Sequence, residues 1–231
     1  MRFARLLIGG AAVVAVLAAA PTAGATNECR GLNPCVPVAG PWVVVPVAQT
    51  TPRQQVQFQL TCPRGFIVAG LDAELSDRAI DLAFLGVSGS PVSPGITTAR
   101  SVAFVGSYVG VGAPAPTFRP HVGCVPASGG GGQRTPTGAA AVFPPGQPAV
   151  RRVVTTRVGA TKRVVASCRA GERLVGWYSA RGFLTETPPT TALVDSLSAT
   201  VRAGGQRVVA VAHMRQGQAV IQVSAVCAGG P

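Results

Sequence analysis

The stretch LTCPRGFIVAG, Leu60–Gly70, returns later in the chain as ASCRAGERLVG, Ala166–Gly176. Both stretches place a cysteine, a glycine, an aliphatic residue and a second glycine at the same offsets. The first glycine suits a tight turn, because glycine adopts backbone angles that other residues avoid. We therefore interpret the stretch as a strand–turn–strand corner that the chain uses twice.

The match between the two halves extends beyond this corner. Each half ends on an apolar strand that carries a cysteine, Cys124 in the first half and Cys227 in the second. Together these matches predict an approximate internal duplication of about 80 residues. The other matched positions are Phe58 with Val164, Leu60 with Ala166, and Ile80-Asp81 with Val194-Asp195.

Residues 1–25 have the three features of a secretory signal peptide. Arg2 and Arg5 form a basic start, Leu6–Ala20 is apolar, and Ala23-Gly24-Ala25 fits the small residues before a cleavage site. A retained membrane anchor is the less favoured alternative, because the apolar run is short and contains two adjacent glycines. We expect cleavage after Ala25 and a secreted, extracellular protein without a membrane span.

The six cysteines predict a disulfide framework, because disulfides persist in exported proteins. Their spacings do not suit zinc, since the sequence has no C-x-x-C pair. We expect a local bridge between Cys29 and Cys35, which enclose turn-forming residues. The repeat favours two longer bridges within the halves, and a cross-bridge between the halves is the alternative. The two longer bridges would be Cys62–Cys124 and Cys168–Cys227.

Short apolar runs broken by glycine, proline and serine predict an all-β fold. We expect two related, disulfide-stapled, β-sandwich-like modules, either separate or packed together as one pseudo-symmetric unit. The expected division is a signal peptide over residues 1–25, an N-terminal disulfide loop over 26–41, a first β module over 42–126, a Gly/Pro-rich linker over 127–149 and a second β module over 150–231.

Three segments of the first half carry more specific expectations. Trp42–Val47 reads WVVVPV, and its proline favours an edge strand. Gln55–Leu60 reads QVQFQL, whose alternation predicts a half-buried strand with the three glutamines on one face. Leu71–Leu82 fits either a short helix or a strand–turn–strand, and we favour a strand around Ile80–Leu85.

Two segments of the second half are also assigned from their residues. Ala192–Val201 is a predicted strand, and the Gly-Gly pair within Ala203–Gln206 predicts the turn of a hairpin. A hairpin at this position would place the strands on either side of it next to each other in a sheet.

The corner also resembles a motif of uncharacterised secreted β-rich proteins from high-GC Gram-positive bacteria. The motif is C-P-x-G-x-x-V-x-G followed by a terminal A-V-C-A strand, and it is represented here by CPRGFIVAG and by AVCA at Ala225–Ala228. The second corner departs from it, because Cys168 is followed by Arg169 in place of proline. The resemblance implies a β-rich exported module and supplies no catalytic residue.

Sequence motifs of the common enzyme classes are absent. The chain has no G-x-S-x-G elbow, no H-E-x-x-H and no P-loop. Its two histidines, His121 and His213, stand alone and are expected to be structural or solvent-facing. A Ser–His–Asp triad would need one of them beside a carboxylate in a cleft, because such groups meet in space and not in sequence. We expect a protein that is not an enzyme and needs no cofactor.

Half of the eight acidic residues gather in one short segment. Clustered carboxylates suit calcium, but their spacing does not fit an EF-hand loop. We favour a solvated face, or ion pairs with arginines of the other half, and keep a calcium site as the alternative. The four residues are Asp72, Glu74, Asp77 and Asp81.

The net charge of +12 is concentrated in the second half, where residues 150–231 hold eleven basic and three acidic residues. Such a surface could hold an anionic cell-surface polymer by electrostatic attraction. Nucleic acid is not favoured as a partner, because aromatic residues for base stacking are not interleaved there. We favour a solvated basic surface, because alternation along a strand would scatter these residues over two faces, and keep anionic binding as the alternative. The residues that would bind an anionic surface are Arg151, Arg152, Arg157, Lys162 and Arg163.

These observations favour an exported, non-enzymatic protein of the cell exterior that acts by binding or as a structural component. The alternative is a secreted inhibitor or interaction protein that presents the Pro/Gly-rich loop Gly86–Thr98 to a protein partner. The loop has no counterpart in the second half, which is why it is the segment assigned to this role.

Overall fold

The computed structural model describes residues 26–48, 50–86, 99–112, 115–127 and 150–229, which form thirteen strands and one short helix. The predicted all-β fold class is therefore confirmed. The predicted signal peptide, nearly all of the predicted linker and the loop Gly86–Thr98 beyond its first residue lie outside the described residues. None of the described helices has the length and apolar character needed to cross a membrane.

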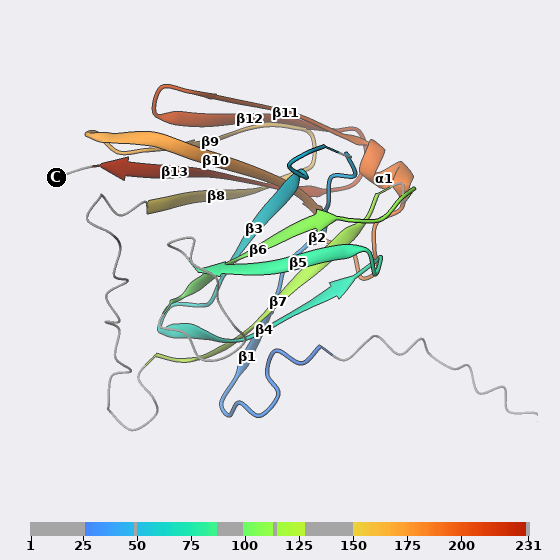
Figure 1. The fold of residues 1–231 in the computed structure, drawn as a ribbon, viewed down its shortest axis with the longest axis vertical. Coiled ribbons are helices and arrows are strands. Elements are labelled where there is room, and N and C mark those ends of the chain that lie inside the picture. The colour runs from blue at the N-terminus through green and yellow to red at the C-terminus, as the bar shows by residue number, and fades with distance from the viewer. Residues whose placement is uncertain (1–25, 49, 87–98, 113–114, 128–149, 230–231) are drawn as a thin grey trace, which may run out of the picture.

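The first half is a sandwich of two sheets around one hydrophobic core (Figure 1). One layer has the strand order β3–β6–β5, and in the other β7 lies between β4 and β1. The core between the layers includes Phe58, Phe104 and Phe118. The strands are β1 (Val36–Ala39), β3 (Gln55–Thr61), β4 (Phe66–Leu75), β5 (Ile80–Gly86), β6 (Ser101–Tyr108) and β7 (Thr117–Pro126).

The second half repeats this layering with a core of smaller side chains. One layer has the order β10–β13–β8 and the other the order β11–β12–β9. Phe183, Ile221 and Met214 lie in the core between them. The elements are β8 (Val150–Val158), β9 (Thr161–Ser167), β10 (Glu172–Phe183), α1 (Thr191–Asp195), β11 (Leu197–Gly204), β12 (Arg207–Met214) and β13 (Ala219–Gly229).

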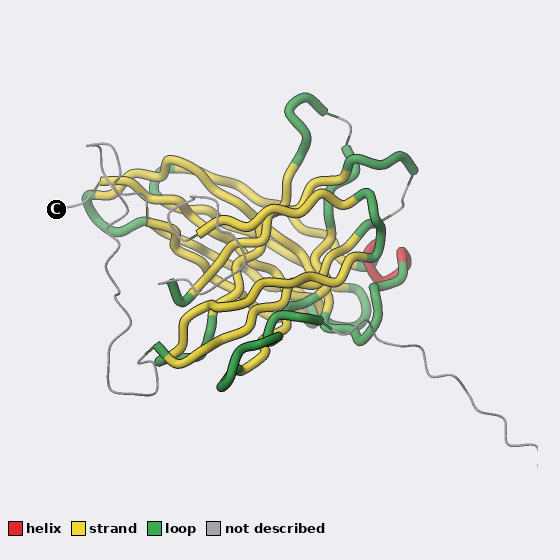
Figure 2. The backbone as a smooth tube through the Cα atoms, turned by 60° about the horizontal axis from the view of Figure 1, so that its bottom comes forward, coloured by secondary structure: helices red, strands yellow, loops and turns green. Residues whose placement is uncertain are grey.

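Strand β2 (Trp42–Val44) joins the two halves into one sheet of seven strands. It pairs with β7 on one side and with β10 on the other, so it lies inside the sheet. The prediction of an edge strand is therefore wrong: the strand ends at Val44, and Pro46 lies beyond it, where it removes no ladder hydrogen bond. Figure 2 shows the continuous strand-rich body that results.

The two halves share their strand pairings at the quoted corner. β4 pairs with β7 with a shift of register between Val68 and Gly70, and β10 pairs with β13 with a shift between Leu174 and Gly176. The turn glycines before these strands, Gly65 and Gly171, have φ angles of 83° and 82°, in the left-handed region that favours glycine.

The middle of the predicted repeat does not align as expected. Val194-Asp195 was matched to Ile80-Asp81, yet Ile80 begins β5 while Val194 and Asp195 belong to α1. The start of the predicted strand Ala192–Val201 is likewise helical. The helix forms there because the side chain of Thr190 caps its first turn by accepting a hydrogen bond from the Leu193 N–H (3.3 Å).

The three disulfides pair the cysteines as predicted. Cys29–Cys35 closes a local loop at the N-terminal segment, which also contributes β1. Cys62–Cys124 and Cys168–Cys227 each join the residue after an early strand to the last strand of the same half. The alternative of a bridge between the halves is wrong.

The glutamine face of β3 is not solvated as in a half-buried strand. Val56, Phe58 and Leu60 are buried as predicted, but Gln57 is buried as well. The Gln59 N–H donates to Gln222 Oε1 (2.7 Å), and Gln222 Nε2 donates to the Gln59 carbonyl (3.0 Å). Gln57 and Gln59 are covered because this part of the face packs against the second half, whereas Gln55 stays exposed.

The ambiguous segment Leu71–Leu82 is a strand–turn–strand. Its first residues continue β4 to Leu75, and β5 begins at Ile80, where a strand was favoured. The predicted hairpin turn at Ala203–Gln206 is also present, since β11 ends at Gly204 and β12 begins at Arg207.

Candidate functional site

The five basic residues predicted to bind an anionic surface are not brought together. Arg151 and Arg152 are neighbours on β8, so their side chains leave opposite faces of the strand. Arg151 donates to Gln57 Oε1 of the first half (2.7 Å), and its guanidinium lies 5.1 Å from the ring centre of Tyr178. Burial lowers the pKa of Arg151 below its usual value, and this arginine belongs to the contact between the halves.

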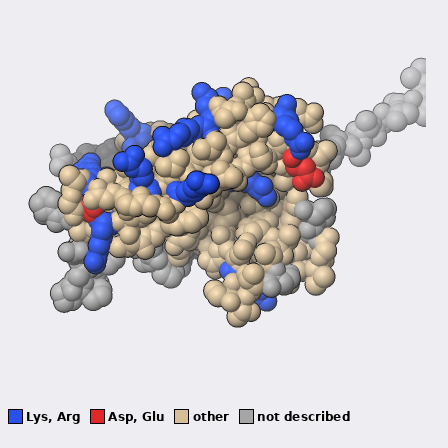
Figure 3. Space-filling view, turned by 90° about the horizontal axis from the view of Figure 1, so that it is seen from above, with Lys and Arg blue, Asp and Glu red and all other residues tan. Residues whose placement is uncertain are grey.

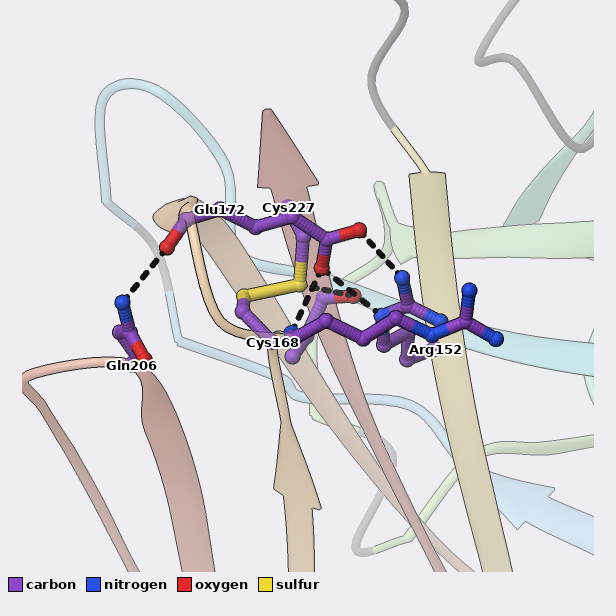
Figure 4. Close-up of a disulfide and its surroundings, with 7 residues drawn as sticks. Arg152, Cys168, Glu172, Gln206 and Cys227 are labelled. Atoms are coloured by element: carbon purple, nitrogen blue, oxygen red, sulfur yellow. Dashed lines mark hydrogen bonds and ion pairs between the residues drawn. A yellow bond between two sulfur atoms is a disulfide. The ribbon is translucent and has the colours of Figure 1, made fainter. Parts of the chain in front are cut away.

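Arg152 is engaged in a different contact, beside the Cys168–Cys227 disulfide (Figure 4). Its Nε donates to Glu172 Oε2 (3.0 Å) and its Nη2 forms an ion pair with Glu172 Oε1. The hydrogen bonds from Arg152 and from the Arg169 backbone N–H hold the pKa of Glu172 below its usual value. Gln206 then donates to the Glu172 carbonyl (2.8 Å), which ties the β11–β12 hairpin to this corner.

The same corner is the only group of potential metal ligands close together among the described residues. It consists of Cys168, Glu172 and Cys227. Because both sulfurs are already bonded to each other, they cannot act as thiolate ligands. The group is therefore a disulfide bridge with an ion pair beside it.

The remaining predicted basic residues are exposed but point in different directions. Lys162 and Arg163 lie next to each other on β9 and so occupy opposite faces of that strand. Arg157 lies in the lining of a cleft of about 400 Å³ between β3 and the β8–β13 pair. In this cleft the polar groups of Gln59, Gln222 and Thr155 are hydrogen-bonded to one another.

The carboxylates of the predicted acidic cluster are held by protein groups. Asp72 accepts from the Asn27 N–H (2.6 Å), and Asp77 accepts from the Ala79 N–H (2.7 Å) and from the Tyr108 hydroxyl (3.2 Å). These two carboxylates secure the N-terminal segment and the β4–β5 turn.

The other two acidic residues do not complete a calcium site. Glu74 forms an ion pair with Arg119 (3.7 Å), so its arginine partner comes from the same half and not from the other half as expected. Asp81 is exposed on β5. In the described part of the chain the four carboxylates do not converge on one point.

Each histidine has a structural contact. His121 is buried on β7, with its Nε2 2.8 Å from Glu74 Oε1 and its Nδ1 3.7 Å from Glu28 Oε1. His213 is exposed on β12 and hydrogen-bonds to the Thr161 hydroxyl (2.9 Å). His121 does meet carboxylates, but neither of the two grooves described here has a histidine or a carboxylate in its lining.

A groove of about 230 Å³ that the sequence did not indicate lies beneath β11. Its lining combines many apolar side chains with Gln55, Ser179 and Arg181. It exists because the side chains along its walls are small, Ala180, Ala199 and Ala210 among them. The apolar members of the lining are Val44, Pro46, Val56, Ala180, Ala199, Val201, Ala210 and Ile221.

The floor of this groove is the core-facing side of β10. Ser179 and Arg181 lie opposite Val223 and Ile221 of β13, both of which are buried in the second core. Trp177 shares this face, because it lies two residues before Ser179. Yet Arg181 is exposed and 43% of Trp177 is exposed, since β11 leaves this end of the sandwich open.

The roof of the groove is β11, whose residues Ala199, Val201 and Ala203 lie opposite core residues of β12. They therefore point toward the sandwich interior, but Ala199 and Ala203 remain exposed. An arginine without a described partner thus lines an open apolar groove, and an exposed tryptophan lies further along the same face of β10. The alternation in LSATVRAG predicts a half-buried strand, but only the packing shows that its inner face is uncovered.

A comparison of the chain with known protein families, with curated proteins and with solved structures finds no match.

Proposed function

We propose that this chain is an exported binding protein of the cell exterior that acts without catalysis and holds its partner in the groove beneath β11. The observation that carries the proposal is the groove itself, with Trp177 and Arg181 exposed on a face of β10 that elsewhere is core. Concave, largely apolar sites with a few polar groups are typical of binding sites. The three disulfides support export, because such bridges persist in oxidising compartments.

The proposal is tested by asking whether the immobilised protein captures a partner from a cell-envelope extract. The chain from Thr26 onward is immobilised and exposed to an extract of the cell envelope of its source, and the retained molecules are identified. Ala199→Trp fills the groove and should remove the capture. Thr200→Trp adds the same side chain to the opposite, outward face of β11 and should leave it unchanged. Capture that survives both substitutions, or no capture by the unchanged chain, would contradict the proposal.

A second candidate function is electrostatic capture of an anionic polymer by the outer face of the β11–β12–β9 sheet. Arg163, Arg202 and Arg207 are exposed, and each lies in a cross-strand row that faces away from the core. Figure 3 shows Lys and Arg side chains spread over this side of the molecule, with acidic side chains near its ends.

Heparin is a suitable anionic probe for this second candidate. Its binding should weaken steeply as salt is raised, and Arg163→Ser with Arg207→Ser should weaken it further. Binding that does not respond to salt would exclude electrostatic capture. Because these arginines lie on the outer face, the same variants should leave capture through the groove unchanged.

A further inference from the structure

The outer edge of β11 carries backbone groups that no described residue uses. The Met214 N–H donates to the Ala160 carbonyl on the β9 side, so even-numbered residues of β12 face β9 and odd-numbered ones face β11. The odd-numbered residues of β12 pair with Ser198, Thr200 and Arg202. The backbone groups of the alternate residues Ala199, Val201 and Ala203 therefore point to the open edge.

This edge lacks the protection that the edges at β4, β8 and β9 have. β4 has a shift of register between Val68 and Gly70, and it carries Asp72 and Glu74. The edge strands β8 and β9 are rich in basic residues. β11 is eight residues long, pairs with β12 without a shift of register and carries Arg202 as its one charge. Long, regular and weakly charged edges are templates for pairing with another strand.

We propose that β11 accepts an extended, acidic peptide segment of a partner as an additional strand, with alternate side chains of the peptide entering the groove. The inference rests on the proposed function and names the chemistry of the partner. Strand addition takes its affinity from main-chain hydrogen bonds and its specificity from pockets for alternate side chains. Here the residues that present the edge hydrogen bonds, Ala199 and Val201, also line the groove.

The chemistry of the groove favours a peptide over a glycan. Most of its lining is apolar, which suits aliphatic side chains and offers few donors to sugar hydroxyls. Arg202 on the roof strand makes no ion pair with a described residue and points outward, to the side where the peptide's side chains between the apolar ones would lie. Its charge, within a half that holds eleven basic and three acidic residues, complements acidic side chains at those positions.

The probe is an end-capped peptide of the length of β11, eight residues, that alternates Val and Glu. Its binding should shift the NMR signals of the Ala199, Val201 and Ala203 amides and protect them from hydrogen exchange. Methylating the amide nitrogens along one edge of the peptide should weaken binding at least about tenfold, because several main-chain hydrogen bonds are lost. Replacing Glu by Lys should weaken it by a similar factor at low salt.

Val201→Pro removes an edge N–H without breaking the ladder to β12, and proline is tolerated at such positions. This variant should still fold, with a somewhat lower melting temperature because Val201 is partly buried against the second core, and should lose peptide binding. Binding that survives both the proline and the N-methyl groups would overturn strand addition. If envelope capture is lost in Ala199→Trp but kept in Val201→Pro, the groove binds something other than a strand. The inference would then fail while the proposed function stands.

Discussion

Val43 and Val44 are neighbours in the chain, yet their side chains lie in two different hydrophobic cores. Val43 packs with the core of the first half and Val44 with that of the second. Both side chains are almost fully buried. The arrangement follows from the alternation of a strand that pairs with β7 on one side and with β10 on the other. The two halves are thus coupled through consecutive residues.

Val43→Ala and Val44→Ala should each lower the free energy of unfolding by about 2 kcal/mol, because each removes buried methyl groups and leaves a cavity. Since both residues belong to one strand, each substitution should shift a single cooperative transition in urea. Val47→Ala, at an exposed position, is the matched control and should have little effect. Two separate transitions, of which Val44→Ala moves only one, would show that the halves unfold independently.

Gly70→Ala should destabilise the protein by about 1–3 kcal/mol, because the added methyl group would overlap the Glu28 carbonyl oxygen and displace the N-terminal segment. Gly176 occupies the same place in the second corner, where a methyl group would lie 3.7 Å from its nearest neighbour, Val226. Gly176→Ala should therefore be neutral or slightly stabilising. Equal effects in thermal unfolding would contradict this difference between the corners.

Gln222→Ala should cost about 1–3 kcal/mol, because it leaves the backbone N–H and carbonyl of Gln59 without their partners inside the contact between the halves. Only 3% of Gln222 is exposed, so water cannot simply replace it. Gln218→Ala, at an exposed position nearby, is the control. A chemical denaturation curve that is the same for both variants would show that the pair contributes nothing.

Glu172→Gln should lower the melting temperature at neutral pH and have no effect in strong acid. The folded protein holds the pKa of Glu172 below its ordinary value, so the ionised carboxylate stabilises the fold above the pKa of the unfolded chain. This stabilisation is lost as the pH falls through the lower pKa of the folded state. The difference between the two proteins should therefore shrink with falling pH. Glu186→Gln, at an exposed position, should show no such trend.

The sequence was sufficient for the parts of the fold that depend on local chemistry. The turn at Gly65 and Gly171 needs a left-handed backbone, and the matching cysteines then define the two long bridges. Most strands follow from their apolar alternation. The helix at Thr191–Asp195 was missed because its signal is a single cap and less than two turns.

The features that depend on contacts between distant segments could not be predicted from the sequence. A half-buried strand and an interface strand have the same alternation, so QVQFQL gave no sign that Gln57 and Gln59 meet the second half. The groove beneath β11 is open because β11 leaves this end of the sandwich uncovered. No local sequence pattern encodes which segments will cover a strand. The basic residues are close only in the chain, and strand alternation sends neighbouring members to opposite faces, as the sequence already indicated.

The central position of β2 has a consequence for the order of assembly. Trp42 pairs with Phe183, which lies 141 residues later in the chain, and β2 fills the place between strands of both halves. A chain that is synthesised from its N-terminus must therefore leave one edge of β2 unpaired until β10 has been made. Such distant pairing slows folding and leaves strand edges uncovered in the meantime. Until then, chaperones and proteases would encounter this protein as an incomplete sheet.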